Sequence, residues 1–239
     1  MFYQFTEDLR RTGTNLQDYT ALIQDVEHYE THALIGCTEL FYKDDYVDSA
    51  RHFQKSLWLR DDVVEPAGYL AFVLNTGLVP DSLADGFSRD IIPMYYNAGL
   101  KSDNAFTHYQ LGALYYNGIG EKNYGKDLKK AYECFERSYS ILPQGFVAGQ
   151  LGYMFLTGEG VEENDKMAIH YLVEGDRLGD LNATMILSQC YEHGFGVKKD
   201  LQKSKALSEK GKQLSAPDTS TILKSYVEPM MTKHKEEEN

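Results

Sequence analysis

An apolar residue followed by a small one recurs along the chain at a nearly constant interval. The spacings between successive pairs are 35, 41, 40 and 36 residues, and a fixed period of this length is typical of repeat proteins. The five pairs are Ile35-Gly36, Leu70-Ala71, Leu111-Gly112, Leu151-Gly152 and Leu187-Ser188. Seven positions after the apolar residue, four units carry a glycine, and the last three carry another two positions later. These glycines are Gly77, Gly118, Gly120, Gly158, Gly160, Gly194 and Gly196. Each unit is therefore expected to be a helix that ends in a glycine-rich turn.

A second helix is predicted after each turn. Asp127, Asp165 and Asp200 follow the turns of the last three units, and an aspartate there is suited to accept hydrogen bonds from the first free backbone N–H groups of a helix. Behind them runs a stripe of small and aromatic or apolar residues that fall on one helix face. Its members are Ala50 and Phe53; Ile92, Tyr95 and Gly99; Ala131, Phe135 and Ser138; Ala168, Tyr171 and Gly175; Ser204, Leu207 and Gly211. Such a face allows a neighbouring helix to approach closely while the large side chain fills the gap.

Three turn motifs carry a resemblance to a known family. They read LGALYYNGIG from Leu111, LGYMFLTGEGV from Leu151 and LSQCYEHGFGVKKD from Leu187, and they resemble Sel1-like repeats. The unit at 66–100 departs from the pattern, because Val79 stands where the second glycine is expected and Pro93 interrupts the second helix. The unit at 33–60 lacks the turn glycine and is more similar to a tetratricopeptide repeat.

The predicted fold is an all-α, right-handed α-solenoid of about five helix-turn-helix repeats with capping helices, because single helix pairs cannot bury their own apolar surface. The predicted divisions are 1–32 for N-terminal capping helices, 33–65 for a tetratricopeptide-like repeat and 66–103 for a degenerate Sel1-like repeat. Three Sel1-like repeats follow at 104–212, then a C-terminal capping helix at 213–232 and a disordered tail at 233–239.

The chain has 239 residues and a formal net charge of −12, and the charge is unevenly spread. Residues 1–100 contain sixteen acidic and seven basic residues, whereas 101–239 contain twenty and seventeen. This balance disfavours nucleic acid and anionic lipid, which need basic surfaces, and favours a basic partner. A solvated, solubilising acidic face is the alternative interpretation.

Aromatic residues accompany the acidic residues of the first half. An aromatic and carboxylate mixture suits partners that carry arginine or lysine. The region predicted to bind a partner comprises Tyr42, Asp44, Asp45, Asp48, Trp58, Asp61, Asp62, Tyr69 and Tyr109. Tyr115, Tyr116, Tyr153 and Tyr191 recur near one place in the first helix of their repeats, so they are predicted to be core residues.

The sequence offers little catalytic or metal-binding chemistry. Cys37, Cys134 and Cys190 occupy different repeat positions, so they are predicted to be buried hydrophobes without disulfides. His28 and His32 lie one turn apart, but no third ligand is evident, and neither a metal nor a cofactor is predicted. No hydrolase or phosphate-binding motif occurs. The odd cysteine count and the N-terminal sequence favour a cytoplasmic protein without a membrane span.

The leading functional hypothesis is a non-catalytic protein-interaction scaffold, since solenoids present extended binding surfaces. The resemblance to Sel1-like proteins implies adaptors in signalling and host interactions. A sharper version is an immunity protein that neutralises a basic toxin. The alternatives are an adaptor subunit of a larger complex and a hydrolase, an activity that the resemblance to Sel1-like proteins also implies.

Overall fold

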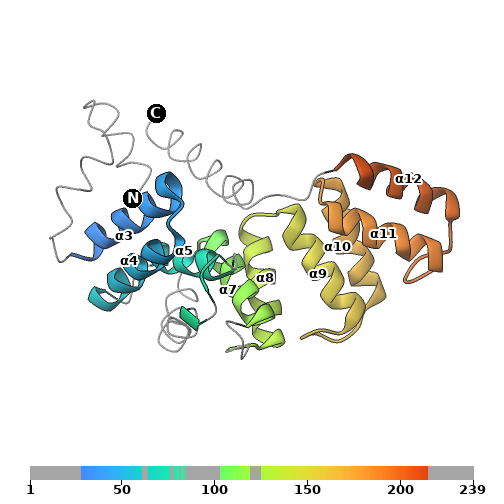
Figure 1. Cartoon of the computed structure of the whole chain (residues 1–239). Helices are drawn as coiled ribbons and strands as arrows, with labels where there is room; N and C mark the ends of the chain where they lie inside the picture. Colours follow the sequence, from blue (N-terminus) through green and yellow to red (C-terminus); the bar gives the residue numbers. More distant parts are fainter. Residues whose placement is uncertain are drawn as a thin grey trace, which may run out of the picture. The chain divides into compact units, whose positions relative to one another are not determined.

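The computed structural model describes residues 28–60, 64–75, 78–80, 82–83, 103–118 and 125–214 (Figure 1). Within these ranges the secondary structure consists of nine α-helices and one π-helical segment, with no strand. The predicted all-α class of helix-turn-helix solenoid repeats is confirmed. Of the capping segments predicted at 1–32 and 213–232, residues 1–27 and 215–232 lie outside the described residues, as does the tail predicted at 233–239.

The helices fall into two compact units. One comprises residues 1–102 with 117–126, and the other comprises residues 103–116 with 127–239. The first unit holds α3 (Tyr29–Thr38), the π-helical segment η1 (Glu39–Lys43), α4 (Tyr46–Leu59) and α5 (Val64–Asn75). The second holds nearly all of α7 (Ala105–Asn117), together with α8 (Leu128–Ile141), α9 (Gly145–Thr157), α10 (Asp165–Arg177), α11 (Leu181–His193) and α12 (Leu201–Gln213).

In the first unit, α3 packs against α4 and α4 packs against α5. The small residue after the apolar anchor makes the first contact possible, because a Cβ added at Gly36 would lie only 2.8 Å from the Phe53 ring. The ring of Phe53 also stacks on Tyr69 of α5, with 5.6 Å between the centroids. Ser49 Oγ donates a hydrogen bond to the Gly36 carbonyl at 2.9 Å, so the close approach also satisfies a buried hydroxyl.

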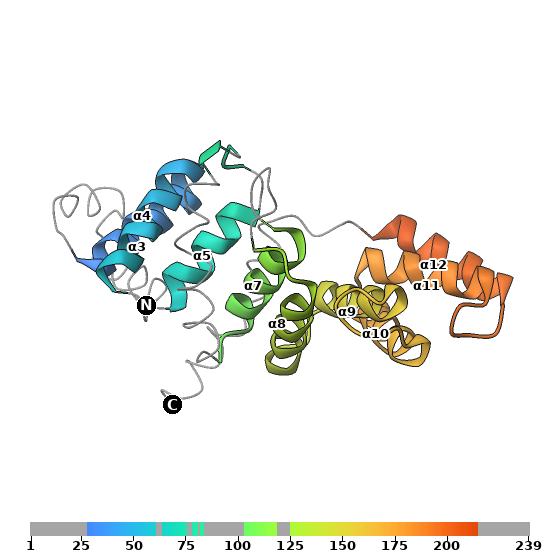
Figure 2. The same cartoon turned by 90° about the horizontal axis from the view of Figure 1, so that it is seen from below.

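In the second unit, α9 packs against α10 and α11 packs against α12, as Figures 1 and 2 show, and α10 and α11 join the two pairs. The side chain facing the small residue differs between repeats. A Cβ at Gly112 would meet the Phe135 ring at 2.6 Å, whereas a Cβ at Gly152 would meet Leu172 at 2.7 Å. At the third repeat Ser188 replaces the glycine, and its hydroxyl donates to the Ser204 carbonyl at 2.8 Å.

The five apolar anchors are all buried, as the repeat pattern predicts. The second-helix stripe is buried as well at the positions that the structure describes, except that Leu207 is only partly covered. The stripe positions Ile92, Tyr95 and Gly99 of the degenerate repeat lie outside the described residues.

The turn glycines adopt the left-handed backbone conformation that their type permits. The φ angles are 73° at Gly118, 70° at Gly158, 76° at Gly160, 86° at Gly194 and 63° at Gly196. Gly77 and Gly120 lie outside the described residues. These observations confirm the predicted turns of the last two repeats.

The predicted helix caps need one correction. Asp127 and Asp200 cap α8 and α12, since their carboxylates accept from Lys130 N and Lys203 N. At α10, however, the cap is Asn164, whose side chain accepts from Met167 N, and Asp165 is the first helical residue. Both residue types suit their places, because asparagine is a strong cap and an acidic residue in the first turn is favoured by the helix dipole.

Candidate protein-interaction site

Three of the predicted acidic residues meet at the junction of η1 and α4, which we call the acidic turn (Asp44, Asp45 and Asp48). Asp44 ends η1 in the left-handed conformation, with φ of 54°. Asp45 caps α4 and accepts from Asp48 N at 3.0 Å. The sequence folds this way because two short polar residues end one helix and begin the next without an intervening loop.

The carboxylates of the acidic turn differ in their partners. Asp48 pairs with Arg51 at 2.6 Å, and the neighbouring Lys43 pairs with Glu39 at 2.7 Å. Asp44 and Asp45 make no ion pair within the described residues. Both are exposed, so their negative charge is available at the surface.

The aromatic residues of the predicted binding region are dispersed. Trp58 lies near the C-terminal end of α4 with 62% of its surface exposed, and Leu59 beside it is 46% exposed. Tyr69 is partly buried against Phe53. Trp58 and Leu59 thus leave apolar surface exposed at this end of α4.

Tyr109 belongs to the second unit and serves packing there. Its ring contacts Phe146, with 4.9 Å between centroids, and Phe135, with 5.9 Å. Burial first, and the charge of Asp180 next, raise the pKa of Tyr109 to about 12. Tyr109 therefore belongs to a different unit from the other described residues of the predicted region. Tyr42 belongs to η1, but its side chain is not described, and Asp61 and Asp62 lie outside the described residues.

The prediction that the recurring tyrosines are core residues is correct only for Tyr115, which is 3% exposed. Tyr116, Tyr153 and Tyr191 are partly exposed. Tyr116 donates to Glu159 Oε2 at 2.5 Å, and burial together with this hydrogen bond raises the pKa of Tyr116 to about 12. The helical step of 100° per residue could have separated Tyr115 from Tyr116, because adjacent residues face different sides of a helix.

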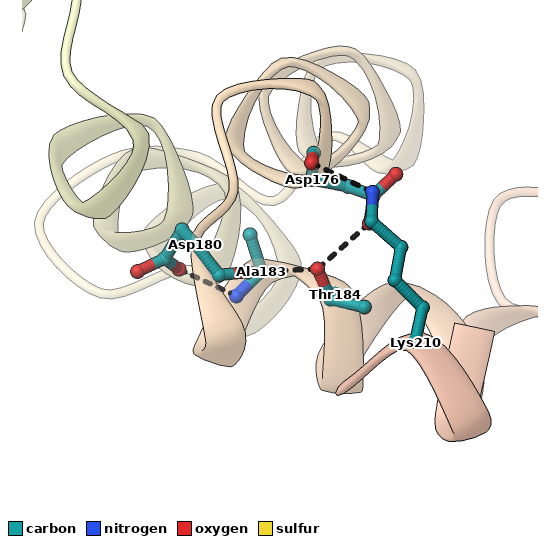
Figure 3. Close-up of polar contacts among 5 residues, drawn as sticks. All are labelled: Asp176, Asp180, Ala183, Thr184 and Lys210. Carbon is teal, nitrogen blue, oxygen red and sulfur yellow. Dashed lines mark hydrogen bonds and ion pairs between the residues drawn. The ribbon is translucent and has the colours of Figure 1, made fainter. Parts of the chain in front are cut away.

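A polar network joins the last three helices (Figure 3). Asp176 Oδ1 on α10 lies 2.7 Å from the Thr184 hydroxyl on α11 and 2.7 Å from Lys210 Nζ on α12. Lys210 also donates to the Asp176 carbonyl at 2.9 Å. This network fixes α12 against the preceding pair, so it is a structural feature of the solenoid.

Asp180 caps α11 beside this network and is almost completely buried, at 4% exposure. Its Oδ1 accepts from Ala183 N at 2.7 Å, whereas its Oδ2 is buried without a hydrogen-bond partner among the described residues. Burial raises the pKa of Asp180 above its ordinary value, although hydrogen bonds from Ala183 and Asn182 oppose the shift.

Cys37, Cys134 and Cys190 are buried, as predicted, and all three are free thiols in this structure. Burial raises the pKa of Cys134 to about 12 and also raises that of Cys190, which leaves both thiols protonated and weakly nucleophilic. In the part of the chain that the structure describes, no three side chains form a metal-binding group. Among the same residues, no helix has the length and apolar character needed to cross a bilayer.

The sequence profile of the Sel1 repeat matches residues 105–140, 148–174 and 181–214. This stretch of the chain consists of Sel1 repeats. The three matches fall on the helix pairs α7–α8, α9–α10 and α11–α12, and they confirm the resemblance carried by the turn motifs. Sel1 repeats generally serve as protein-interaction scaffolds. No curated protein matches the sequence.

Solved structures share this helical solenoid fold at low sequence identity. A Sel1 repeat protein from Oxalobacter formigenes is 18% identical, with a TM-score of 0.60 over 86% of this chain and 80% of that chain. The protein c5321, a protective antigen of uropathogenic Escherichia coli with an SLR fold, is 17% identical with a TM-score of 0.61; the match covers 83% of this chain and 42% of c5321. MamA is 17% identical, with a TM-score of 0.52 over 75% and 93% of the two chains. At these identities the likeness concerns the fold alone.

Proposed function

We propose that this protein is a non-catalytic scaffold that captures a basic protein partner, and that it acts as an immunity protein which neutralises a toxin. The observation that carries the proposal is the surface of α4 and the turn before it, which presents the carboxylates of Asp44 and Asp45 and the exposed indole of Trp58. Exposed tryptophan and carboxylates together suit a partner rich in lysine and arginine.

The charge of the whole chain supports the same kind of partner. A net charge of −12, concentrated in the first hundred residues, attracts a cationic protein over distances longer than a contact and speeds its association. A basic active-site cleft, such as that of a nuclease, is a surface that an acidic protein of this kind would occupy. Inhibition then follows from blocking the cleft and needs no chemistry from the scaffold.

Affinity capture from the native cell tests this proposal. The tagged full chain is used as bait at low salt, the bound proteins are eluted with high salt, and the eluate is identified by mass spectrometry. We expect one basic protein whose binding is reversed by salt. Recovery of only acidic or salt-resistant proteins would contradict the proposal.

An activity assay on the captured protein distinguishes an inhibitor from an adaptor. A toxin neutralised by this chain should lose its activity in the complex at equimolar ratio. Retained activity would instead assign the chain the role of an adaptor that localises its partner.

A further inference from the structure

Four side chains on consecutive Sel1 repeats form a cluster of rings, an amide and a carboxylate at the surface of the second unit. We call it the Tyr116 cluster: Tyr116 on α7, Gln150 and Tyr153 on α9, and Glu159 in the turn after α9. Burial is the main cause of the raised pKa of Tyr116, and the Tyr153 hydroxyl adds a smaller electrostatic effect in the same direction. All four residues are partly exposed, although the Gln150 amide nitrogen itself is buried.

The turn holds Glu159 in a defined position. Gly158 and Gly160 flank it with φ angles of 70° and 76°, and Glu159 N donates to the Met154 carbonyl at 3.2 Å. A Cβ at Gly160 would lie 2.0 Å from the Leu128 carbonyl oxygen, so the turn packs directly on the start of α8. The carboxylate is therefore preorganised before any partner binds.

One oxygen of this carboxylate is used inside the cluster and the other is not. Glu159 Oε2 accepts from the Tyr116 hydroxyl at 2.5 Å. Glu159 Oε1 makes no hydrogen bond or ion pair within the described residues. Because the Tyr116 hydroxyl is a neutral donor, no cation among the described residues neutralises the charge of Glu159.

Other tyrosines of the same repeats already have cations from the chain itself. Lys130 Nζ lies 5.4 Å from the Tyr115 ring centroid, and Lys203 Nζ lies 5.1 Å from that of Tyr191. Within the described residues, neither Tyr116 nor Tyr153 has a lysine or arginine over its ring. The Tyr116 cluster thus combines two rings and a fixed carboxylate, the groups that bind a cationic side chain, and the described part of the chain supplies no cation to it.

We infer that the Tyr116 cluster binds a lysine or arginine side chain of the partner protein. The cationic group lies against the rings of Tyr116 and Tyr153 and donates to Glu159 Oε1. The inference rests on the proposed function in one respect, namely that the partner is a basic protein. The Tyr116 cluster is then a second contact site for the partner, besides the acidic turn, and the side chain that it binds is a lysine or an arginine.

Titration with a minimal peptide tests the site without the natural partner. The full chain is labelled with ¹³C in its tyrosine rings, and the signals of Tyr116 and Tyr153 are assigned from the variants Tyr116→Phe and Tyr153→Phe. The probe is acetyl-Gly-Arg-Gly-amide, and the comparison peptide carries the neutral isostere citrulline in place of arginine. We expect the arginine peptide to shift both signals saturably and the citrulline peptide to leave them unchanged.

Two charge variants locate the contact. Glu159→Gln removes the proposed counter-ion and should weaken peptide binding about tenfold, the usual scale for losing one charge-assisted hydrogen bond. Glu162→Gln makes the same change in net charge at an exposed residue of the same turn and should leave the affinity unchanged. Tyr153→Ala should weaken binding while the Tyr116 to Glu159 hydrogen bond persists. Circular dichroism and the melting temperature verify that each variant is folded.

The inference is overturned by an absence of saturable shifts at Tyr116 and Tyr153, by equal shifts with the citrulline peptide, or by equal effects of Glu159→Gln and Glu162→Gln. These results leave the proposed function intact if native capture still recovers a basic protein. Conversely, arginine-specific binding at the cluster supports the site even where capture recovers no basic partner.

Discussion

The buried carboxyl of Asp180 has two opposing effects on the stability of the fold. As the cap of α11 it satisfies the Ala183 N–H group, yet its second oxygen is buried without a partner. Burial raises the pKa of Asp180, which means that the folded state favours the protonated form. The stability that the folded state gains from holding this carboxyl protonated is fully present below the ordinary aspartate pKa. It is lost as the pH rises through the higher pKa of the folded state.

The substitution Asp180→Asn should therefore raise the melting temperature at neutral pH, because asparagine keeps the capping oxygen without the buried charge. The gain should disappear below about pH 4, where the wild-type carboxyl is protonated. Asp180→Ala should instead lose about 1 kcal/mol from the missing cap. Thermal unfolding of the wild type and of both variants at several pH values measures these effects. A pH-independent effect of Asp180→Asn would contradict a raised pKa of Asp180 in the folded state.

Individual residues were harder to predict than the repeats that contain them. The periodicity placed Tyr116 and Tyr153 in the first helices, but it assigned them to the core because neighbouring aromatic positions were treated alike. Their partial exposure depends on which helix faces pack together, and the contact from Tyr116 to Glu159 crosses 43 residues of sequence. Contacts of that range follow from stacking geometry and leave no local sequence signal.

At the scale of the element, glycine positions fix the turns and the distances between helices. Gly160 and Gly194 both adopt positive φ angles, but their surroundings differ: a Cβ at Gly160 would meet the Leu128 carbonyl at 2.0 Å, whereas at Gly194 the nearest atom is 3.6 Å away. Substitution of Gly194 therefore tests backbone strain alone, whereas substitution of Gly160 tests backbone strain together with steric overlap.

Gly194→Ala should cost about 1 kcal/mol of unfolding free energy, the typical penalty for a side chain in the left-handed region. Gly160→Ala should cost several times more, because backbone atoms of α8 must also move. Urea denaturation of the two variants provides the comparison. Equal destabilisation would show that the turn does not pack on α8 as described.

Gly175 tests the close approach of α10 to the next repeat. A Cβ there would lie 2.5 Å from Ala183 Cβ and 3.1 Å from the Gly145 carbonyl. Gly175→Leu should lower the melting temperature by several degrees or prevent folding, whereas the control Ala206→Leu, on an exposed position of α12, should be near neutral. A melting temperature for Gly175→Leu close to that of the control would contradict the repeat register.

The elements themselves were largely predictable, because each depends on local pattern. Anchors such as Leu151, turn glycines such as Gly158 and caps such as Asp127 are all found where the period requires them. The cap of α10 was displaced by one residue, since Asn164 and Asp165 are both competent caps and the sequence does not rank them.

At the scale of the whole molecule, the uneven charge is the property most relevant to function. The acidic turn was predicted as a cluster, and the structure does bring Asp44, Asp45 and Asp48 together. The pairing of Asp48 with Arg51 could not be foreseen from charge counting, because it depends on the helical register of α4. The exposed carboxylates that remain are those of Asp44 and Asp45.

Asparagine is the appropriate replacement throughout the acidic turn. At position 45 it keeps the helix cap, and at position 44 it tolerates a φ of 54°. The triple change to Asn at Asp44, Asp45 and Asp48 therefore alters charge with little effect on helicity. A matched control replaces the exposed Glu133, Glu162 and Glu192 of the second unit by Gln, which changes the net charge equally.

Parallel capture from the native cell with these three baits tests the central claim most directly. The wild-type chain and the Glu-to-Gln control should retain the same basic protein at low salt, and the acidic-turn variant should retain at least tenfold less of it. Equal recovery by all three baits, or the absence of any basic protein from the wild-type eluate, would contradict capture of a basic partner through the acidic turn.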